Sequence, residues 1–196
     1  MGQGRKQEFN EKEALYGMMR VFWKKGYDGT SYDDLVEGTG VSRAGLYKCF
    51  GDKRSAFMRC LDYYVNTVVR DFTAPMRELN AGLQEIRDYF SSIMNAMTKK
   101  DAYGCLAVNS VGEKITDENK DIRDKIYGMH KLLKVSFVHA LKNAQKNGEL
   151  AKGLNIEAKA HHLLGTAVGA ATMIRGGINK EWIKNFITLS TERLTE

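Results

Sequence analysis

Proline is nearly absent from this chain: Pro75 is the one proline among 196 residues. Proline interrupts a helix, so long stretches without it are free to be helical. No stretch alternates apolar and polar side chains with the period of two that marks a half-buried strand. The sequence therefore predicts an all-α fold. Apolar residues recur at helical spacing over residues 57–72, 79–97, 122–144, 156–174 and 182–189.

Residues 31–50 have the pattern of two short helices joined by a tight turn. Ser31 and Asp34 have the spacing of a capping box, which begins a helix. Gly40 follows where a left-handed residue ends that helix, and Ser42 is a favourable N-cap for the next one. This combination predicts a helix-turn-helix.

Cations occupy positions in this region that the helix dipole disfavours. Arg43 lies in the first turn of the second helix. Lys53 and Arg54 lie in the first turn of a third helix, after its expected cap Asp52. Each placement costs roughly a few tenths of a kcal/mol in the free protein, because helix N-termini carry a partial positive charge. The same placement binds phosphate, so the pattern favours a surface that meets phosphate groups. A solvated basic face on an ordinary three-helix domain is the alternative.

Residues 11–61 resemble the DNA-binding domain of the TetR family of bacterial transcriptional regulators. The matching residues are Ala14, Leu15, Phe22, Gly26, Tyr27, Thr30, Ser31, Asp34, Leu35, Gly40, Val41, Ser42, Leu46, Tyr47, Phe50, Asp52, Lys53 and Phe57. One residue departs from the pattern, since Cys49 stands where the family commonly has histidine. The resemblance implies a DNA-binding domain over residues 1–52. It also implies a C-terminal ligand-binding and dimerisation domain over residues 53–196, whose first helix links the two.

A helix-turn-helix places its second helix in the major groove of double-stranded operator DNA. A dimer places two such helices about 34–36 Å apart, or a multiple of that distance. Arg43 is the candidate for a base contact, and Ala44 and Gly45 would allow close approach to the groove. Other residues would contact phosphates and fix the register. The predicted DNA-binding residues are Thr30, Ser31, Ser42, Arg43, Ala44, Gly45, Tyr47, Lys48 and Lys53.

The composition fits a globular protein with an acidic partner. The net charge of +6 suits DNA, although many enzymes are equally basic. Three cysteines without a CxxC pair argue against a disulfide framework and a zinc site. The longest uncharged stretch, residues 163–174, is too short to span a bilayer, and the N-terminus lacks a signal-peptide pattern. We therefore expect a cytoplasmic protein with no metal, no cofactor and no membrane contact.

Residues 158–177 are rich in Ala and Gly on more than one side of the predicted helix. A helix that is apolar around much of its circumference must be buried on two sides. A homodimer in which the last two helices of each chain form a four-helix bundle meets that requirement. The TetR resemblance also implies dimerisation through the final helices. A core helix buried within one chain is the alternative.

The segment from Tyr103 to Asn109 is the least ordinary part of the C-terminal region. Some TetR-like regulators have a similar Gly-Cys-Leu-x-x-Asn sequence in the short helix that links the effector pocket to the DNA-binding domain. In some of them the cysteine senses electrophiles or oxidants. Cys105 lies near the start of a predicted short helix, which meets one condition for a reactive thiol. A small buried residue at a helix crossing is the alternative.

Met and aromatic side chains over residues 86–137 suit an adaptable pocket for a small apolar effector. Ordinary core packing explains the same residues equally well. His130 is expected to line a pocket or the core, and not to bind a metal. The predicted ligand-binding residues are Phe90, Met94, Met97, Tyr103, Cys105, Asn109, Tyr127 and His130.

The sequence predicts a ligand-responsive repressor that binds a palindromic operator as a dimer and is released by a small-molecule effector. A repressor that senses electrophiles through Cys105 is a variant of this hypothesis. A helical enzyme or adaptor without DNA function is the competing class. No P-loop, G-x-S-x-G or H-E-x-x-H pattern supports that class, so we expect no enzymatic activity. The identities of the operator and of the effector stay open.

Overall fold

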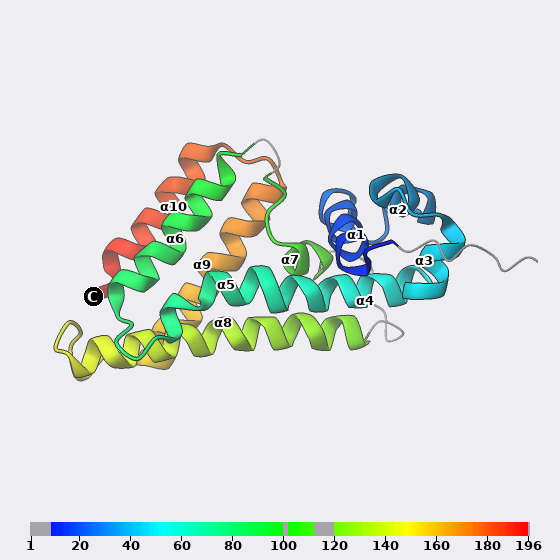
Figure 1. The fold of residues 1–196 in the computed structure, drawn as a ribbon. Helices are drawn as coiled ribbons and strands as arrows, with labels where there is room; N and C mark the ends of the chain where they lie inside the picture. The colour runs from blue at the N-terminus through cyan, green and yellow to red at the C-terminus, as the bar shows by residue number, and fades with distance from the viewer. Residues whose placement is uncertain (1–8, 100–101, 112–119, 196) are drawn as a thin grey trace, which may run out of the picture. The chain divides into compact units, whose positions relative to one another are not determined.

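The computed structural model describes residues 9–99, 102–111 and 120–195, and every regular element in these ranges is helical (Figure 1). The prediction of an all-α fold is confirmed. The chain divides into two compact units, residues 1–64 and 65–196. We predicted a domain boundary after residue 52, where the helix-turn-helix motif ends. The first compact unit also includes the helix that follows this motif, up to residue 64.

The first unit is a small helical domain built around α1. Its helices are α1 (Glu11–Lys25), α2 (Tyr32–Thr39), α3 (Arg43–Phe50) and α4 (Lys53–Tyr64). α1 packs against both α2 and α4. The rings of Phe22 and Phe57 meet edge to face in the core, with their centroids 4.9 Å apart. Other fully buried core residues are Met18, Met19, Leu35 and Leu46.

The local predictions around the turn are confirmed. The backbone N–H of Asp34 donates to Ser31 Oγ (3.1 Å), and the Asp34 carboxylate accepts from the Ser31 N–H (2.8 Å), which completes the capping box. Gly40 ends α2 in the left-handed conformation, with φ at 67°. Ser42 caps α3 by accepting from the Gly45 N–H at 3.2 Å. The chain therefore forms the helix-turn-helix that its sequence predicts.

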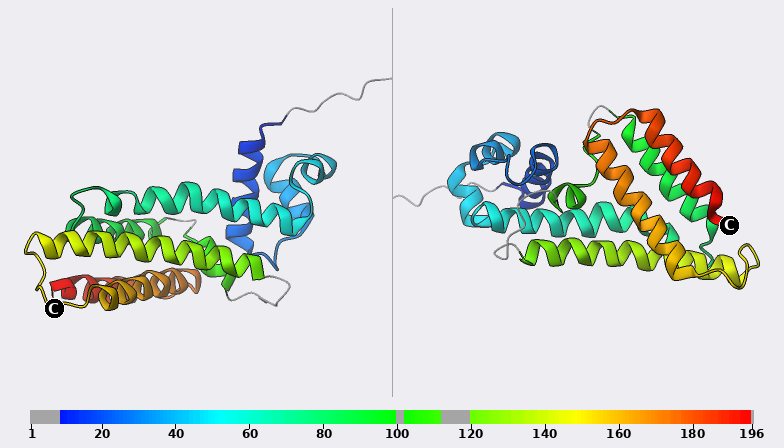
Figure 2. Two further views of the ribbon diagram at one scale, coloured as in Figure 1. Left: turned by 90° about the horizontal axis from the view of Figure 1, so that it is seen from below. Right: turned by 180° about the vertical axis from the view of Figure 1, so that it is seen from behind.

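The second unit is a helical bundle in which long helices are joined by short helical segments. They are a π-helical segment (Val65–Val69), α5 (Arg70–Thr73), a 3-10 turn (Pro75–Arg77), α6 (Leu83–Met97), α7 (Leu106–Val111), α8 (Lys120–Lys146), α9 (Ile156–Arg175), α10 (Lys180–Glu192) and a final 3-10 turn (Arg193–Thr195). α8 packs against α9, and α10 packs against α9 and α6 (Figure 2). Phe90 of α6 stacks on Phe137 of α8 at 5.9 Å within the core that these helices share.

Two details of the helical stripes differ from the prediction. Leu79 was expected in the stripe of α6, but it is 84% exposed, because the helix begins only at Leu83. Glu85 accepts from the Gly82 N–H at 2.6 Å and fixes that start. Residues 57–72 were expected to keep regular helical spacing, but a π-helical segment separates α4 from α5. Among the described residues, no helix is long and apolar enough to cross a bilayer.

Candidate nucleic-acid interface and effector site

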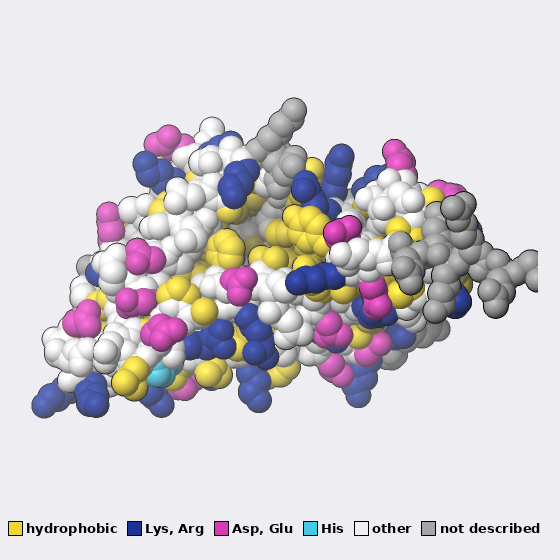
Figure 3. All heavy atoms as spheres, viewed as in Figure 1, with side chains coloured by type: hydrophobic (Ala, Val, Ile, Leu, Met, Phe, Trp, Pro, Cys, Tyr) yellow, Lys and Arg dark blue, Asp and Glu magenta, His cyan; other side chains and the backbone are white. Residues whose placement is uncertain are grey.

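α3 buries one side and exposes the other. Leu46 and Phe50 are buried in the first unit. The exposed side carries Ser42, Arg43, Ala44, Tyr47 and Lys48. Cationic and anionic side chains are interspersed on the surface that Figure 3 shows. The side chains that α3 exposes decide what this helix can contact.

Arg43 is held on the exposed surface by two neighbours. Its Nη2 donates to Asp33 Oδ1 at 2.5 Å, and its guanidinium lies over the Tyr32 ring, 5.4 Å from the centroid. The Tyr32 ring stacks on Tyr47 with centroids 4.6 Å apart, and its hydroxyl donates to Gly51 O at 2.8 Å. Burial, with Tyr47 as the second cause, raises the pKa of Tyr32, which keeps that hydroxyl protonated. The half-exposed Arg43 side chain thus lies over Tyr32, with its guanidinium bonded to Asp33.

Lys53 makes contacts that the sequence did not indicate. Its Nζ donates to Tyr27 O and to Thr30 O, each at 3.0 Å, and lies 4.4 Å from the centroid of the Tyr27 ring. An ammonium group has three N–H donors, so one is left beyond these two bonds. The side chain fastens the loop between α1 and α2 to the start of α4. A contact with phosphate would use only the remaining donor.

Thr30 is not placed as predicted. Its side chain is 2% exposed, and its hydroxyl donates to Gly26 O at 2.5 Å. The prediction of a phosphate contact by this hydroxyl is therefore wrong, because the loop turns the side chain into the unit. Ser31, the next residue, is exposed and caps α2. It stays a candidate for a phosphate contact.

Gly45 has an intramolecular reason to be glycine. A Cβ at this position would lie 3.1 Å from Val41 Cγ1, 3.2 Å from Ser42 Oγ and 3.4 Å from the Phe9 ring. The distances to Val41 and Ser42 are tighter than ordinary van der Waals contacts, and the distance to Phe9 is an ordinary one. Close approach to a groove floor, the reason expected from the sequence, is not needed to explain the residue. A contact between Gly45 and DNA stays a prediction.

Cys49 lies beside a pair of charged residues that the sequence reasoning missed. Arg59 of α4 forms an ion pair with Glu11 of α1, donates to Cys49 O at 2.8 Å and covers the Phe50 ring at 4.6 Å. Burial, with Glu11 as the second cause, raises the pKa of the Cys49 thiol. Arg59 thereby connects α1, α3 and α4. The sequence alone could not predict these contacts, because Glu11 is distant along the chain and the contact with Cys49 is made to its backbone carbonyl.

Three of the eight predicted effector residues belong to the core of the second unit or pack against it. Phe90 and Met97 are buried, and Met94 packs against the same core. Tyr89, which was not predicted, meets Phe90 and Phe137 edge to face at 5.2 and 5.4 Å. The region is therefore aromatic and methionine-rich, as expected. Packing alone would produce the same arrangement.

Two polar atoms in this unit are buried without a hydrogen-bond partner among the described residues. They are Oδ1 of Asn109 and Nε2 of His130. The Asn109 amide donates to Tyr103 O at 2.7 Å, which fixes its orientation on α7. Burial lowers the pKa of His130, so its ring is neutral at pH 7. An unpartnered buried polar atom is unfavourable unless water or a ligand satisfies it.

The Gly-Cys-Leu-x-x-Asn segment passes close to α9. Gly104 has a φ of 74°, and a Cβ there would lie 2.5 Å from Ala171 O, so no other residue fits without movement. Cys105 follows and is partly buried. It lies within electrostatic range of Tyr89, whose pKa is raised by burial and, second, by Cys105. The glycine of this segment thus has a packing role, and a sensing role of the cysteine stays a prediction.

Tyr127 does not join the other predicted effector residues. Its side chain is 70% exposed on α8, whereas Ile126 and Met129 on the same helix are buried. The helical period turns Tyr127 away from the core, so its assignment to a buried pocket is wrong. His130 lies one position after Met129 and is partly buried.

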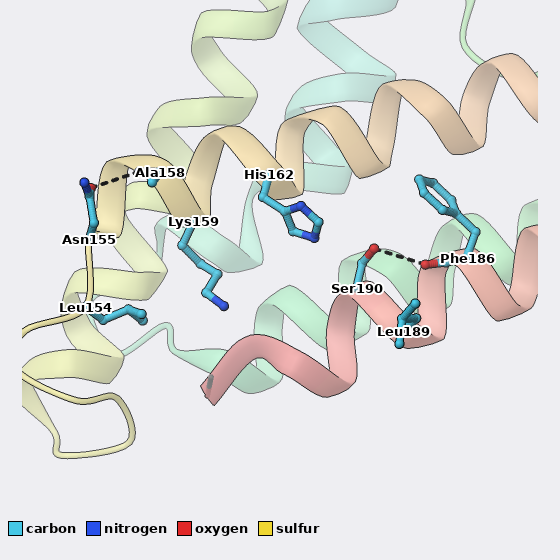
Figure 4. A pocket seen from close by; sticks show the side chains of 8 residues that line it. All are labelled: Leu154, Asn155, Ala158, Lys159, His162, Phe186, Leu189 and Ser190. Carbon is cyan, nitrogen blue, oxygen red and sulfur yellow. Dashed lines mark hydrogen bonds between the residues drawn. The ribbon is translucent and has the colours of Figure 1, made fainter.

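An open groove of about 550 Å³ lies between α9 and α10 (Figure 4). Leu154, Phe186 and Leu189 supply its apolar lining, and Lys159, His162 and Ser190 supply polar groups. None of the predicted effector residues borders it. The small residues of α9 were expected to face a partner chain, but Ala167 and Ala170 are buried in this chain's own core. For these two alanines the alternative of internal packing is correct.

Family models match both parts of the chain. Residues 15–57 match the model described as bacterial regulatory proteins, tetR family. Residues 82–187, more than half of the chain, match the model described as tetracyclin repressor-like, C-terminal domain. The chain belongs to the TetR family. The resemblance of residues 11–61 is thereby confirmed, and the second match extends it to the C-terminal region.

Named relatives of this TetR-family chain are transcriptional regulators. The HTH-type transcriptional repressor ComR of Escherichia coli (strain K12) is 29% identical over 180 residues, which cover 91% of this chain and 85% of ComR. The uncharacterized HTH-type transcriptional regulator YezE of Bacillus subtilis (strain 168) is 31% identical over 166 residues, covering 82% and 83%. The prediction of a regulator in place of an enzyme is confirmed by these relatives.

Solved structures of the family share the fold. CifR, a TetR family transcriptional regulator solved as a cysteine mutant with 26bp double-strand operator DNA, has a TM-score of 0.85 to this chain. The identity is 21%, and the match covers 96% of this chain and 99% of CifR. The family models and the named relatives make this chain a DNA-binding transcriptional regulator, and the solved structure shows that it shares the fold. The roles of single residues, and the likeness of the Gly-Cys-Leu-x-x-Asn segment to sensing relatives, stay predictions.

Proposed function

We propose that this chain is a repressor of the bacterial cytoplasm that binds a palindromic operator as a homodimer and releases it when a small apolar effector binds the second unit. The exposed side of α3, with Ser42 capping it and Arg43 in its first turn, carries the DNA-binding part of the proposal. ComR is named a repressor, and CifR was solved on operator DNA. Both observations support the same role here.

On this proposal, α3 enters the major groove and Arg43 contacts a base edge. Ala44 and Gly45 lie next to the groove floor. The remaining contacts go to phosphates, where hydroxyls and the positive ends of α2 and α3 are suitable donors. The phosphate-contacting residues are Ser31, Ser42, Tyr47 and Lys48, with the third donor of Lys53.

The DNA-binding test uses a duplex selected by the full chain from a randomised library. Its affinity should fall steeply with salt concentration, and Lys48→Ala should flatten the slope by about one. Lys131→Ala, at an exposed position of α8, is the matched control and should leave the slope unchanged. An affinity independent of salt, or equal slopes for the two variants, would contradict the proposed interface.

The dimer is proposed to form on the outer face of α9 and α10. Trp182 and Leu189 are 66% and 53% exposed on α10, and Phe186 lies between them beside the groove of Figure 4. Large apolar side chains gathered on one exposed face mark an interface. A second copy of this face, related by a two-fold axis, would cover them. We therefore propose that the exposed apolar face of α10, in place of the alanines of α9, forms the contact between the two chains.

Sedimentation tests this interface at micromolar concentration. The wild type should be a dimer, and Leu189→Glu should be a folded monomer with little affinity for the selected duplex. Leu79→Glu adds the same charge at a position that is 84% exposed outside the helices of this face. It should remain a dimer. If the Leu189→Glu variant is still a dimer, the interface does not include this face of α10.

The effector is proposed to bind inside the second unit, at a site that joins part of its core to α7 and α8. The residues proposed to contact the effector are Phe90, Met94, Met97, Tyr103, Cys105, Asn109 and His130. The unpartnered atoms Asn109 Oδ1 and His130 Nε2 support this site, because a polar group on an otherwise apolar molecule would satisfy them. To shift the dimer from almost all DNA-bound to almost all DNA-free, the effector must bind the DNA-free state more strongly than the DNA-bound state by about 5.5 kcal/mol. Burial of roughly 220 Å² of apolar surface supplies that much at about 25 cal/mol per Å².

Small apolar compounds that raise the melting temperature should also release the selected duplex. Asn109→Leu and His130→Leu should weaken these compounds by about tenfold or more, since each removes one polar partner. Tyr127→Ala, on the exposed side of α8, should leave them unchanged. Compounds that release DNA equally from all variants would show that they bind elsewhere.

Sensing of electrophiles by Cys105 is the second candidate. Cys105 is partly exposed, whereas Cys60 is buried and its thiol pKa is raised by that burial. N-ethylmaleimide should release DNA from the wild type but not from Cys105→Ser, while a non-reactive compound should release both. A Cys49→Ala background removes the partly exposed thiol of the DNA-binding unit and leaves the buried Cys60 in place. If Cys105→Ser still responds to N-ethylmaleimide, the cysteine serves packing only.

A further inference from the structure

Asp33 is an acidic side chain beside the proposed DNA contact of α3. It is 82% exposed in the first turn of α2, directly beside Arg43 in the first turn of α3. A carboxylate next to a surface that meets phosphates repels them, so it should weaken binding to every DNA sequence. An exposed ion pair also adds little stability to the fold. The helix dipole favours an acid in this turn whether or not the side chain contacts Arg43, so the contact itself has to be explained separately.

The contacts of Arg43 point to a role in orientation. Asp33 accepts a bond from Nη2 of the guanidinium at 2.5 Å, and the guanidinium carbon lies over the Tyr32 ring, 5.4 Å from its centroid. Tyr32 cannot easily swing away, because Tyr47 stacks on it and its hydroxyl is bonded to Gly51 O. These contacts favour one orientation of a flexible side chain before any DNA arrives.

Holding Arg43 in this way leaves donors available for a base. A guanidinium has five N–H groups, and the bond to Asp33 is made by Nη2. Bidentate contact with guanine O6 and N7 needs two parallel donors in a fixed direction. Immobilising a long side chain during binding weakens affinity by roughly two- to tenfold, and prior immobilisation avoids that loss.

We infer that Asp33 is a positioning residue that sets the base preference of the recognition helix by orienting Arg43. The inference rests on the proposed base contact of Arg43. Asp33 contacts no base in this arrangement. It lowers affinity for all duplexes through its charge and raises discrimination between them through Arg43, so the two effects can be measured separately.

The test compares full-chain variants on duplexes selected from a randomised library, with a scrambled duplex as the non-specific probe. Asp33→Ala should broaden the base preference at the position that Arg43→Ala also broadens, and should lower the ratio of selected to scrambled affinity by roughly two- to tenfold. Glu37→Ala is the matched control, since Glu37 is also exposed on α2. It should raise affinity for both probes and leave the base preference unchanged.

The double variant Asp33→Ala/Arg43→Ala decides whether Asp33 acts through Arg43. It should show the same base preference as Arg43→Ala alone. If Asp33→Ala broadens the preference further in that background, or behaves like Glu37→Ala in the wild type, the inference is overturned while the Arg43 contact stands. If Arg43→Ala itself leaves the base preference unchanged, both the contact and the inference fail. A purely structural role of Asp33 would lower the melting temperature without changing the base preference.

Discussion

Lys53→Ala should destabilise the first unit, and this effect should exceed its effect on DNA binding. The ammonium group donates to Tyr27 O and Thr30 O and lies over the Tyr27 ring. Hydrogen bonds that involve a charged group contribute about 1.5–3 kcal/mol each, and an exposed cation–π contact contributes about 0.5–1 kcal/mol. Because Lys53 is only partly buried and both bonds share one cation, we expect a total loss of about 2 kcal/mol.

Tryptophan fluorescence can follow each unit separately. Trp23 belongs to the first unit, where it meets Tyr64 edge to face at 5.0 Å, and Trp182 belongs to the second. In a Trp182→Phe background, urea denaturation followed through Trp23 reports on the first unit alone. A loss of about 2 kcal/mol would lower the melting temperature by roughly 8–16 °C for a unit of this size.

Lys48→Ala is the control, because Lys48 is a lysine of the same unit that lies on the exposed side of α3. It should change the free energy of unfolding by less than about 0.5 kcal/mol. Lys53→Met should recover part of the loss, since it keeps the apolar stem against Tyr27 but not the bonds. If Lys53→Ala and the wild type unfold at the same urea concentration, the carbonyl contacts contribute nothing and the reasoning is refuted.

Three further outcomes follow from single contacts. Gly104→Ala should destabilise the second unit by about 1–3 kcal/mol in urea denaturation, because φ is 74° and the new Cβ would lie 2.5 Å from Ala171 O; unchanged stability would contradict this packing. The bond from Lys25, with those from the α2 cap, lowers the pKa of Asp34 from 3.8 to about 2. Its stabilisation is thus present above about pH 4 and lost as the pH falls through about 2, and Asp34→Asn should remove that part of the acid dependence of the melting temperature. Native Cys49 should react with iodoacetamide more slowly than in urea, as mass spectrometry would show, because burial raises the pKa of its thiol.

The parts of the fold that depend on neighbouring residues could be predicted from the sequence. The capping box of Ser31 and Asp34, the left-handed Gly40 and the cap at Ser42 are all set by residues within a few positions of one another. Helical periodicity likewise predicted the long helices. Leu79 was misplaced because periodicity does not show where a helix begins, and the start of α6 depends on the cap formed by Glu85.

The candidate site was predictable in location but not in its contacts. Thr30 and Ser31 are adjacent and similar in chemistry, and only the packing of the loop decides that one is buried and the other exposed. The partners of Lys53 lie 23 and 26 positions away, so no local pattern could indicate them. Asp33 and Arg43 are ten residues apart on different helices, and their ion pair depends on the angle of the turn between those helices.

α2 and α3 are eight residues long each. Helices shorter than about 12–15 residues are marginal in water when isolated, so neither would keep its shape as a free peptide. Within the unit, contacts with other helices stabilise α3, and the bonds by which Arg59 joins α3 to α1 and α4 are an example. A synthetic α3 peptide is therefore a poor starting point for a designed DNA ligand. Redesign of sequence preference has to exchange the exposed side chains of α3 within the intact unit.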